Sequence, residues 1–116
     1  MNKYRDKSDF EINKAVAVSL GYTAEYENES VTVFRNNNGG MPLVVSSTAD
    51  SSDNFDPCNK PVNAMPIINE YGISLMYQDR EFRVATNDGN YYCCMSNPLK
   101  AAMVIFLMMK EAENEK

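Results

Sequence analysis

The sequence predicts an α+β fold, a small α/β sandwich in which N- and C-terminal helices and a short central helix pack on a small, mainly antiparallel sheet. Two observations support this prediction. Apolar residues recur at helical spacing near both ends of the chain. Between them, short runs of β-branched and aromatic residues alternate with turn residues. A chain of 116 residues has room for one hydrophobic core, so we expect a single domain over 1–116, with flexible tails at 1–7 and 112–116.

The first helix is predicted at about 9–20. Ser8 and Glu11 have capping-box spacing, in which the Ser8 hydroxyl accepts a hydrogen bond from the Glu11 backbone N–H. The apolar residues that follow recur along one helical face: Ile12, Ala15, Val16 and Leu20. Gly21 is then suited to end the helix in the left-handed conformation.

Strands are predicted in two groups. Residues 31–35 and 43–47 favour a hairpin with a long loop, and a second strand pair is expected at 73–77 and 81–85, with a further strand at 91–95. The polar stretch 48–54 contains Asp50 and Asp53 but lacks the glycine and distal glutamate of a calcium loop, so we expect no metal there.

A central helix is expected within residues 61–71, and Pro66 leaves its start open. If Asn63 is the cap, Pro66 occupies the third helical position, where its missing N–H has no partner to lose. If Pro61 is the first helical residue, Pro66 lies in the interior and removes a hydrogen bond. Gly72 ends the helix in either case.

The C-terminal helix is predicted at about 98–112, with Asn97 as its cap and Pro98 at its first position. From Leu99 to Met109 every residue except Lys100 is apolar. A helix that is apolar on all sides must be covered by its own domain, by a second copy or by a partner. We expect these residues to be core, and we also expect a homo-oligomer formed through Phe106, Met103 and Met109.

Composition excludes several function classes. The net charge is −5, so the chain lacks the basic surface that duplex nucleic acid or an anionic membrane attracts, and neither partner is expected. The absence of histidine excludes Ser-His-Asp and Cys-His catalysis and histidine-ligated zinc. Phosphate-binding glycine motifs are also absent. We therefore expect no enzyme activity, no cofactor and no metal.

The three cysteines have no disulfide-framework spacing, and no signal peptide opens the chain, so we expect a reducing cytosol. Cys93 and Cys94 are adjacent, which places their side chains on opposite faces of a strand and makes a poor metal half-site. Their expected role is structural, as small core residues.

The candidate ligand site is the proline-bounded polar loop at 54–60, extended by the start of the central helix and by one predicted turn. Its residues are Asn54, Asp56, Cys58, Asn59, Lys60, Asn63, Tyr77, Arg80 and Arg83. We expect Lys60 and one of the two arginines to hold a small anionic ligand, with Tyr77 stacking on a base. The simpler interpretation is that the loop only positions the following helix and that the three turn residues are ordinary exposed strand residues.

Four ordered segments resemble the NinX-like proteins of lambdoid bacteriophages: SDFEINKAVAVSLG (8–21), FDPCNKPVNAMPII (55–68), GISL (72–75) and NPLKAAMVIFLMMKE (97–111). This chain has Asn63-Ala64-Met65-Pro66 where the family usually has Asp-Ala-Trp-Pro. The resemblance implies a phage-encoded accessory protein in the cytoplasm of the infected cell, with helices packed on a small sheet. It implies no activity.

The sequence and the resemblance leave three candidate functions for this protein. The first is a binder that sequesters a small host molecule, such as a nucleotide immune signal. The second is an interaction module that inhibits or redirects a host protein. The third, an enzyme, is the one we expect least. A polar pocket favours the first function, an exposed apolar patch the second, and perturbed carboxylates or a metal the third.

Overall fold

The computed structural model describes residues 4, 6–48 and 54–114. Asp50 and Asp53 of the predicted acidic loop lie outside the described residues, as do 1–3, 5 and 115–116 of the predicted tails. The elements in chain order are α1 (Asp9–Ser19), β1 (Tyr22–Glu27), β2 (Val31–Asn36), β3 (Leu43–Ser46), α2 (Pro61–Tyr71), β4 (Ser74–Gln78), β5 (Glu81–Asn87), β6 (Tyr91–Cys93) and α3 (Pro98–Asn114). The predicted α+β class, with terminal helices and a short central helix, is confirmed.

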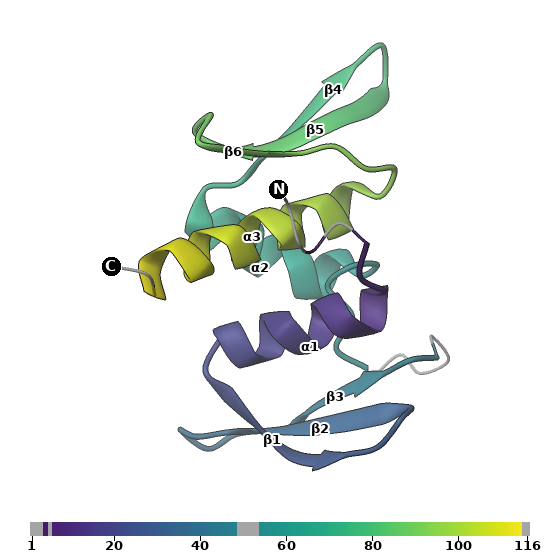
Figure 1. Cartoon of the computed structure of the whole chain (residues 1–116), viewed down its shortest axis with the longest axis vertical. Helices are drawn as coiled ribbons and strands as arrows, with labels where there is room; N and C mark the ends of the chain where they lie inside the picture. The colour runs from purple at the N-terminus through teal and green to yellow at the C-terminus, as the bar shows by residue number, and fades with distance from the viewer. Residues whose placement is uncertain (1–3, 5, 49–53, 115–116) are drawn as a thin grey trace.

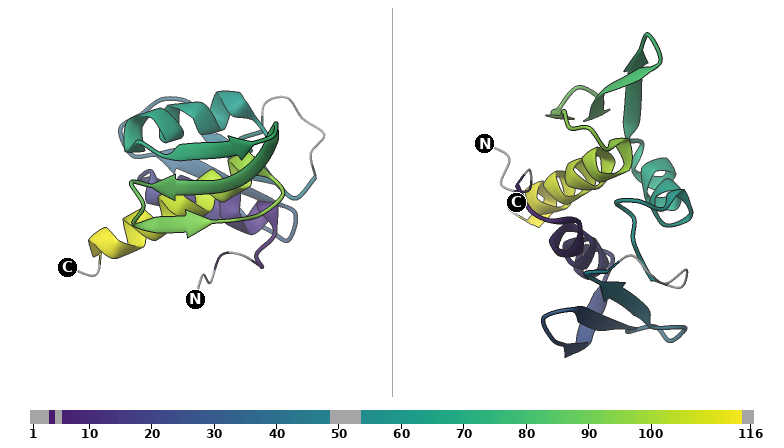
Figure 2. Two further views of the ribbon diagram at one scale, coloured as in Figure 1. Left: turned by 90° about the horizontal axis from the view of Figure 1, so that it is seen from above. Right: turned by 90° about the vertical axis from the view of Figure 1, so that its right-hand side faces the viewer.

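The strands form two antiparallel sheets rather than the single expected one. The N-terminal sheet has the order β1-β2-β3 and the C-terminal sheet the order β4-β5-β6. Figure 1 shows the two sheets at opposite ends of the molecule with the helices between them. α1 packs on the N-terminal sheet, and α3 packs on the C-terminal sheet, on α1 and on α2. The right-hand view in Figure 2 shows the same order of layers from the side.

The chain repeats one topology, a helix followed by a three-stranded meander. α1 and α2 each contain 11 residues, and each is followed by a glycine with positive φ, +98° at Gly21 and +64° at Gly72. Sequence reasoning missed this repetition because it missed β1. Alanine and glutamate are depleted in strands, and every β1 residue after Tyr22 is exposed, so the segment has little hydrophobic alternation.

α3 is the centre of the hydrophobic core. Residues 101–107 are all buried, with exposures between 0 and 3%, and the Phe106 ring meets the Tyr71 ring edge-on at 4.9 Å. Met103 and Phe106 are 0% exposed, so the self-association surface predicted from them is wrong. Only Met109 of that set is half-buried. The helix is covered by its own chain.

The structure corrects the end of α3 and decides between the two predicted starts of α2. α3 continues to Asn114, so 112–114 are helical and not part of a tail. Glutamate and alanine favour helix in this segment, and Lys110 pairs with Glu113 at 3.9 Å. α2 begins at Pro61 with Pro66 in its interior, which selects the second of the two predicted starts. The Asn63 side chain is not the cap of α2.

Candidate functional site

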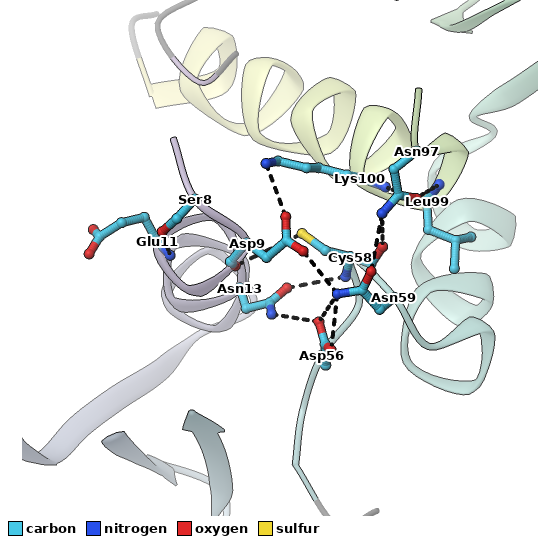
Figure 3. A network of polar contacts seen from close by, with 10 residues as sticks. All are labelled: Ser8, Asp9, Glu11, Asn13, Asp56, Cys58, Asn59, Asn97, Leu99 and Lys100. Atoms are coloured by element: carbon cyan, nitrogen blue, oxygen red, sulfur yellow. Dashed lines mark hydrogen bonds and ion pairs between the residues drawn. The ribbon is translucent and has the colours of Figure 1, made fainter. Parts of the chain in front are cut away.

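The candidate site is a polar junction at which the N-terminal ends of α1 and α3 meet the loop that precedes α2 (Figure 3). The polar side chains of this loop and of the two helix ends bond to one another and form one continuous network. We call this network the polar junction, and its members are Asp9, Asn13, Asp56, Cys58, Asn59, Asn97 and Lys100.

Both helix caps at the junction were predicted from sequence and are confirmed. The Ser8 hydroxyl accepts a hydrogen bond from the Glu11 N–H at 3.2 Å. The Asn97 side-chain oxygen accepts from the N–H groups of Leu99 and Lys100 at 3.0 and 3.2 Å. Asn97 also donates its amide to the Cys58 carbonyl at 2.7 Å, so the cap of α3 fixes the loop at the same time.

Asn13 connects the inner side of the junction. This side chain is only 2% exposed although it lies on the apolar face of α1. Its amide donates to Asp56 Oδ1 at 2.8 Å, and its oxygen accepts from the Cys58 N–H at 3.2 Å. The sequence signal was a polar residue between Ile12 and Val16, and our prediction overlooked it.

Asn59 closes the junction on its solvent side. Its amide donates to Asp9 Oδ2 at 3.0 Å and to both Asp56 oxygens at 3.2 Å. Lys100 Nζ lies 3.0 Å from Asp9 Oδ1. Asp9 and Lys100 are therefore further junction residues that sequence reasoning missed, because they become neighbours only when α1 and α3 pack together.

The surroundings of the junction shift the pKa values of two of its groups, Asp9 and Cys58, in opposite directions. Burial alone would raise the pKa of Asp9, but the hydrogen bonds from Asn59 and Lys100 outweigh it and lower the pKa. Burial, followed by the nearby charges of Asp9 and Asp56, raises the pKa of the Cys58 thiol far above its ordinary value. Cys58 is therefore a neutral thiol at neutral pH and a poor nucleophile.

A small polar pocket of about 80 Å³ lies beside the junction. Its lining is mostly polar and comes from α1, the end of β3 and the loop: Asp9, Phe10, Asn13, Ser46, Ser47, Thr48, Asn54, Asp56, Asn59 and Lys60. Lys60 donates to the Asn54 carbonyl at 2.9 Å. Two carboxylates and one ammonium thus share this pocket.

The structure assembles six of the nine predicted ligand residues in one region: Asn54, Asp56, Cys58, Asn59, Lys60 and Asn63. Asn63 belongs to this group because its side-chain oxygen accepts from the Asp56 N–H at 2.9 Å. A carboxylate at position 63 could accept the same bond, so the Asp-to-Asn departure from the family pattern keeps this contact possible.

Tyr77, Arg80 and Arg83 are placed elsewhere, on the β4–β5 hairpin of the C-terminal sheet. Arg83 pairs with Glu81 at 3.3 Å, and the Tyr77 ring meets the Phe82 ring at 5.6 Å. None of the three lines the polar pocket. The expected pairing of Lys60 with an arginine failed because it assumed one sheet, whereas this hairpin lies at the far end of the molecule (Figure 1).

A second cavity, which we call the α2 groove, is open and mainly apolar, with a volume of about 320 Å³. It is lined by residues from the C-terminal cap of α1, from β3, from the loop before α2 and from α2 itself: Leu20, Leu43, Phe55, Val62, Asn63, Pro66, Ile67, Glu70 and Tyr71. Val62 is 77% exposed and Met65, one helical turn away, is 38% exposed. Sequence reasoning did not predict this groove, because it forms between elements that are distant in the chain.

Two further findings concern ligands and membranes. Among the described residues, no group of three or more His, Cys, Asp or Glu side chains is arranged to hold a metal ion. No helix within the same part of the chain has the length and apolar character needed to cross a membrane.

The fold and the junction define a small α+β protein in which two antiparallel sheets enclose three helices joined by a polar network. The chain belongs to the bacteriophage NinX family. The family sequence model described as "Bacteriophage P22, NinX" matches residues 3–110. No curated protein and no solved structure matches the chain.

Proposed function

We propose that this phage protein acts in the cytoplasm of the infected cell as an accessory binding protein without catalytic activity, and that it inhibits or redirects a host protein. The observation that supports this function is the α2 groove. It is an open, mainly apolar groove of about 320 Å³, the kind of surface on which the apolar face of a partner helix docks. Apolar side chains dominate its lining, and Val62 remains largely exposed.

The chemistry of the groove indicates the kind of partner. Glu70 lines it, and none of the lining residues is Lys or Arg. The whole chain carries a net charge of −5. A partner segment that combines apolar side chains with positive charge would bury the groove and pair with Glu70, as an amphipathic helix does in a hydrophobic groove.

The polar junction supports binding over catalysis. Its carboxylates accept hydrogen bonds from Asn13 and Asn59, so they are occupied in holding the helices together. The Cys58 thiol is buried, and its pKa is raised. An activated nucleophile needs a lowered pKa or an adjacent base.

The groove is tested with a fluorescein-labelled amphipathic helical peptide of leucine and lysine, titrated by fluorescence anisotropy. We expect the wild-type protein to bind the peptide and both Val62→Ser and Glu70→Lys to bind it at least about fivefold more weakly, a loss of roughly 1 kcal/mol. Val18→Ser and Glu29→Lys are matched controls, because both residues are exposed and lie outside the groove. Absence of binding, or equal losses in the controls, would contradict the proposal.

Sequestration of a nucleotide is the second candidate. Lys60 and the hydroxyls of Ser46, Ser47 and Thr48 in the polar pocket favour it. The pocket volume of about 80 Å³ and its two carboxylates oppose it. Calorimetric titration of nucleotide second messengers into wild type and Lys60→Ala separates the two functions. Heat in the wild type that is lost in Lys60→Ala would favour sequestration, and no heat would leave the protein-binding function.

A further inference from the structure

We propose that two copies of this chain associate through β4, in an antiparallel two-fold pairing that joins their C-terminal sheets into one six-stranded sheet. β4 is at the edge of its sheet and pairs only with β5 among the described strands. An edge strand presents a row of unpaired backbone N–H and C=O groups, which form hydrogen bonds readily with another strand.

β4 lacks the features by which proteins usually protect an edge. Its sequence, Ser-Leu-Met-Tyr-Gln, contains no charged residue and no proline. β1, the corresponding edge of the N-terminal sheet, contains Glu25 and Glu27. Charged side chains on an edge oppose pairing with a second chain. The two edges therefore differ in chemistry although they occupy the same place in the repeated topology.

The position of the β-bulges strengthens this difference. In the N-terminal sheet the register shifts between Ala24 and Tyr26, so the extra residue lies on the edge strand β1 itself. In the C-terminal sheet Met76 pairs with Val84 and Tyr77 pairs with Phe82. The extra residue there is Arg83 on the central strand, so β4 adds no residue of its own and keeps a regular edge.

The remaining edges are less suited to pairing. The β3 edge is partly occupied, because the Phe55 N–H donates to the Val44 carbonyl at 2.8 Å. β6 contains only three residues, fewer than the five of β4. Among the described strands each copy thus has one suitable edge, which makes a closed dimer the expected assembly, rather than a fibre.

Side chains along β4 fit a second copy of the same strand. Met76 and Tyr77 are 52 and 55% exposed, and pairing with a second copy would decrease this exposure. In a register centred on Met76, Ser74 lies opposite Gln78 of the second copy and Leu75 opposite its Tyr77. No like charges meet across this edge, since the strand has none.

The test is the mass of the protein in solution by analytical ultracentrifugation. At roughly 100 µM we expect wild type to sediment at about twice 13.1 kDa, and Met76→Lys and Tyr77→Glu to raise the dimer dissociation constant at least about tenfold. Met41→Lys is the matched control, because Met41 is 83% exposed and lies outside the strands. Wild type that is monomeric at this concentration, or edge variants that dimerise as tightly as the control, would overturn the proposal.

Hydrogen exchange of wild type supplies a readout that needs no variant. Amides of β4 should exchange more slowly as the protein concentration rises about a hundredfold, whereas amides of β1 should change much less. Equal behaviour of the two edge strands would overturn the assignment to β4 even if a dimer exists.

Discussion

The two halves of the molecule repeat one topology but cover their sheets differently. In the first half α1, the helix that precedes the N-terminal sheet, packs on it. In the second half the C-terminal sheet is covered by α3, the helix that follows it, while α2 packs beside α3. α1 is buried along one face, whereas seven consecutive residues of α3 are buried. The number of apolar faces on each helix thus reflects how many other helices and sheets pack on it.

The largest expected effect on stability comes from a mutation in α3, the helix that packs both on α1 of the first half and on the C-terminal sheet. Phe106→Ala should lower the free energy of unfolding by about 3–5 kcal/mol, because the ring is 0% exposed and its removal leaves a cavity. Chemical denaturation monitored by circular dichroism measures this loss. Val18→Ala, on the exposed part of α1, is the control and should cost less than about 1 kcal/mol. A comparably small cost for Phe106→Ala would contradict the central position of α3.

A smaller loss is expected where the first half is joined to the loop before α2. Asn13→Ala removes the acceptor of the buried Cys58 N–H and a donor to Asp56. An unsatisfied buried group costs about 1–3 kcal/mol, so we expect a loss of that size in urea denaturation.

Asn37 is the matched control for Asn13, because it is exposed and donates to the Gly21 carbonyl at 3.1 Å. Asn37→Ala should change stability by less than about 1 kcal/mol. Similar losses for the two asparagines would show that the junction does not join the halves.

The junction should also lose stability in acid. The pKa of Asp9 is lower in the folded protein than its ordinary value, so the contribution of its carboxylate is fully present above the unfolded pKa and is lost as the pH falls through the folded pKa. Urea midpoints of wild type and Asp9→Asn should therefore differ by a constant amount from about pH 7 to pH 5 and converge below about pH 4. A difference independent of pH would exclude this role for Asp9.

The smallest expected effect is a gain at the β4–β5 turn. Asp79 and Arg80 both have positive φ, 56 and 69°, as a two-residue type I′ turn requires. Arg80→Gly should raise stability by about 0.5–1 kcal/mol, because glycine adopts this conformation without steric cost. Arg83→Gly, within strand β5, should lower it. Destabilisation by Arg80→Gly would indicate that the arginine side chain contributes contacts that outweigh its backbone strain.

Local signals in the sequence were sufficient for the helices and for most strands. The caps Ser8 and Asn97 and the terminator Gly21 act within a few residues of their own positions, so their roles could be predicted. The all-apolar pattern of α3 correctly predicted burial but did not identify what buries it. That question depends on how α1, α2 and the C-terminal sheet are placed around the helix.

The candidate site was predicted only in its contiguous part. Residues 54–60 lie together because they are neighbours in the chain. Asp9, Asn13 and Lys100 join them through the packing of α1 and α3, which no local pattern encodes. Arg80 and Arg83 were assigned to the site because one sheet was assumed, and the division into two sheets separates them from it.

The most direct test of the central position of α3 is hydrogen exchange on Met76→Lys, the variant in which pairing through β4 is opposed. The amides of residues 103–107 should be the slowest to exchange, and their opening free energy should equal that of global unfolding. This protection should be independent of protein concentration, because the helix is covered by its own chain. Exchange of these amides as fast as that of the exposed β1 strand, or protection that rises with concentration, would contradict the account.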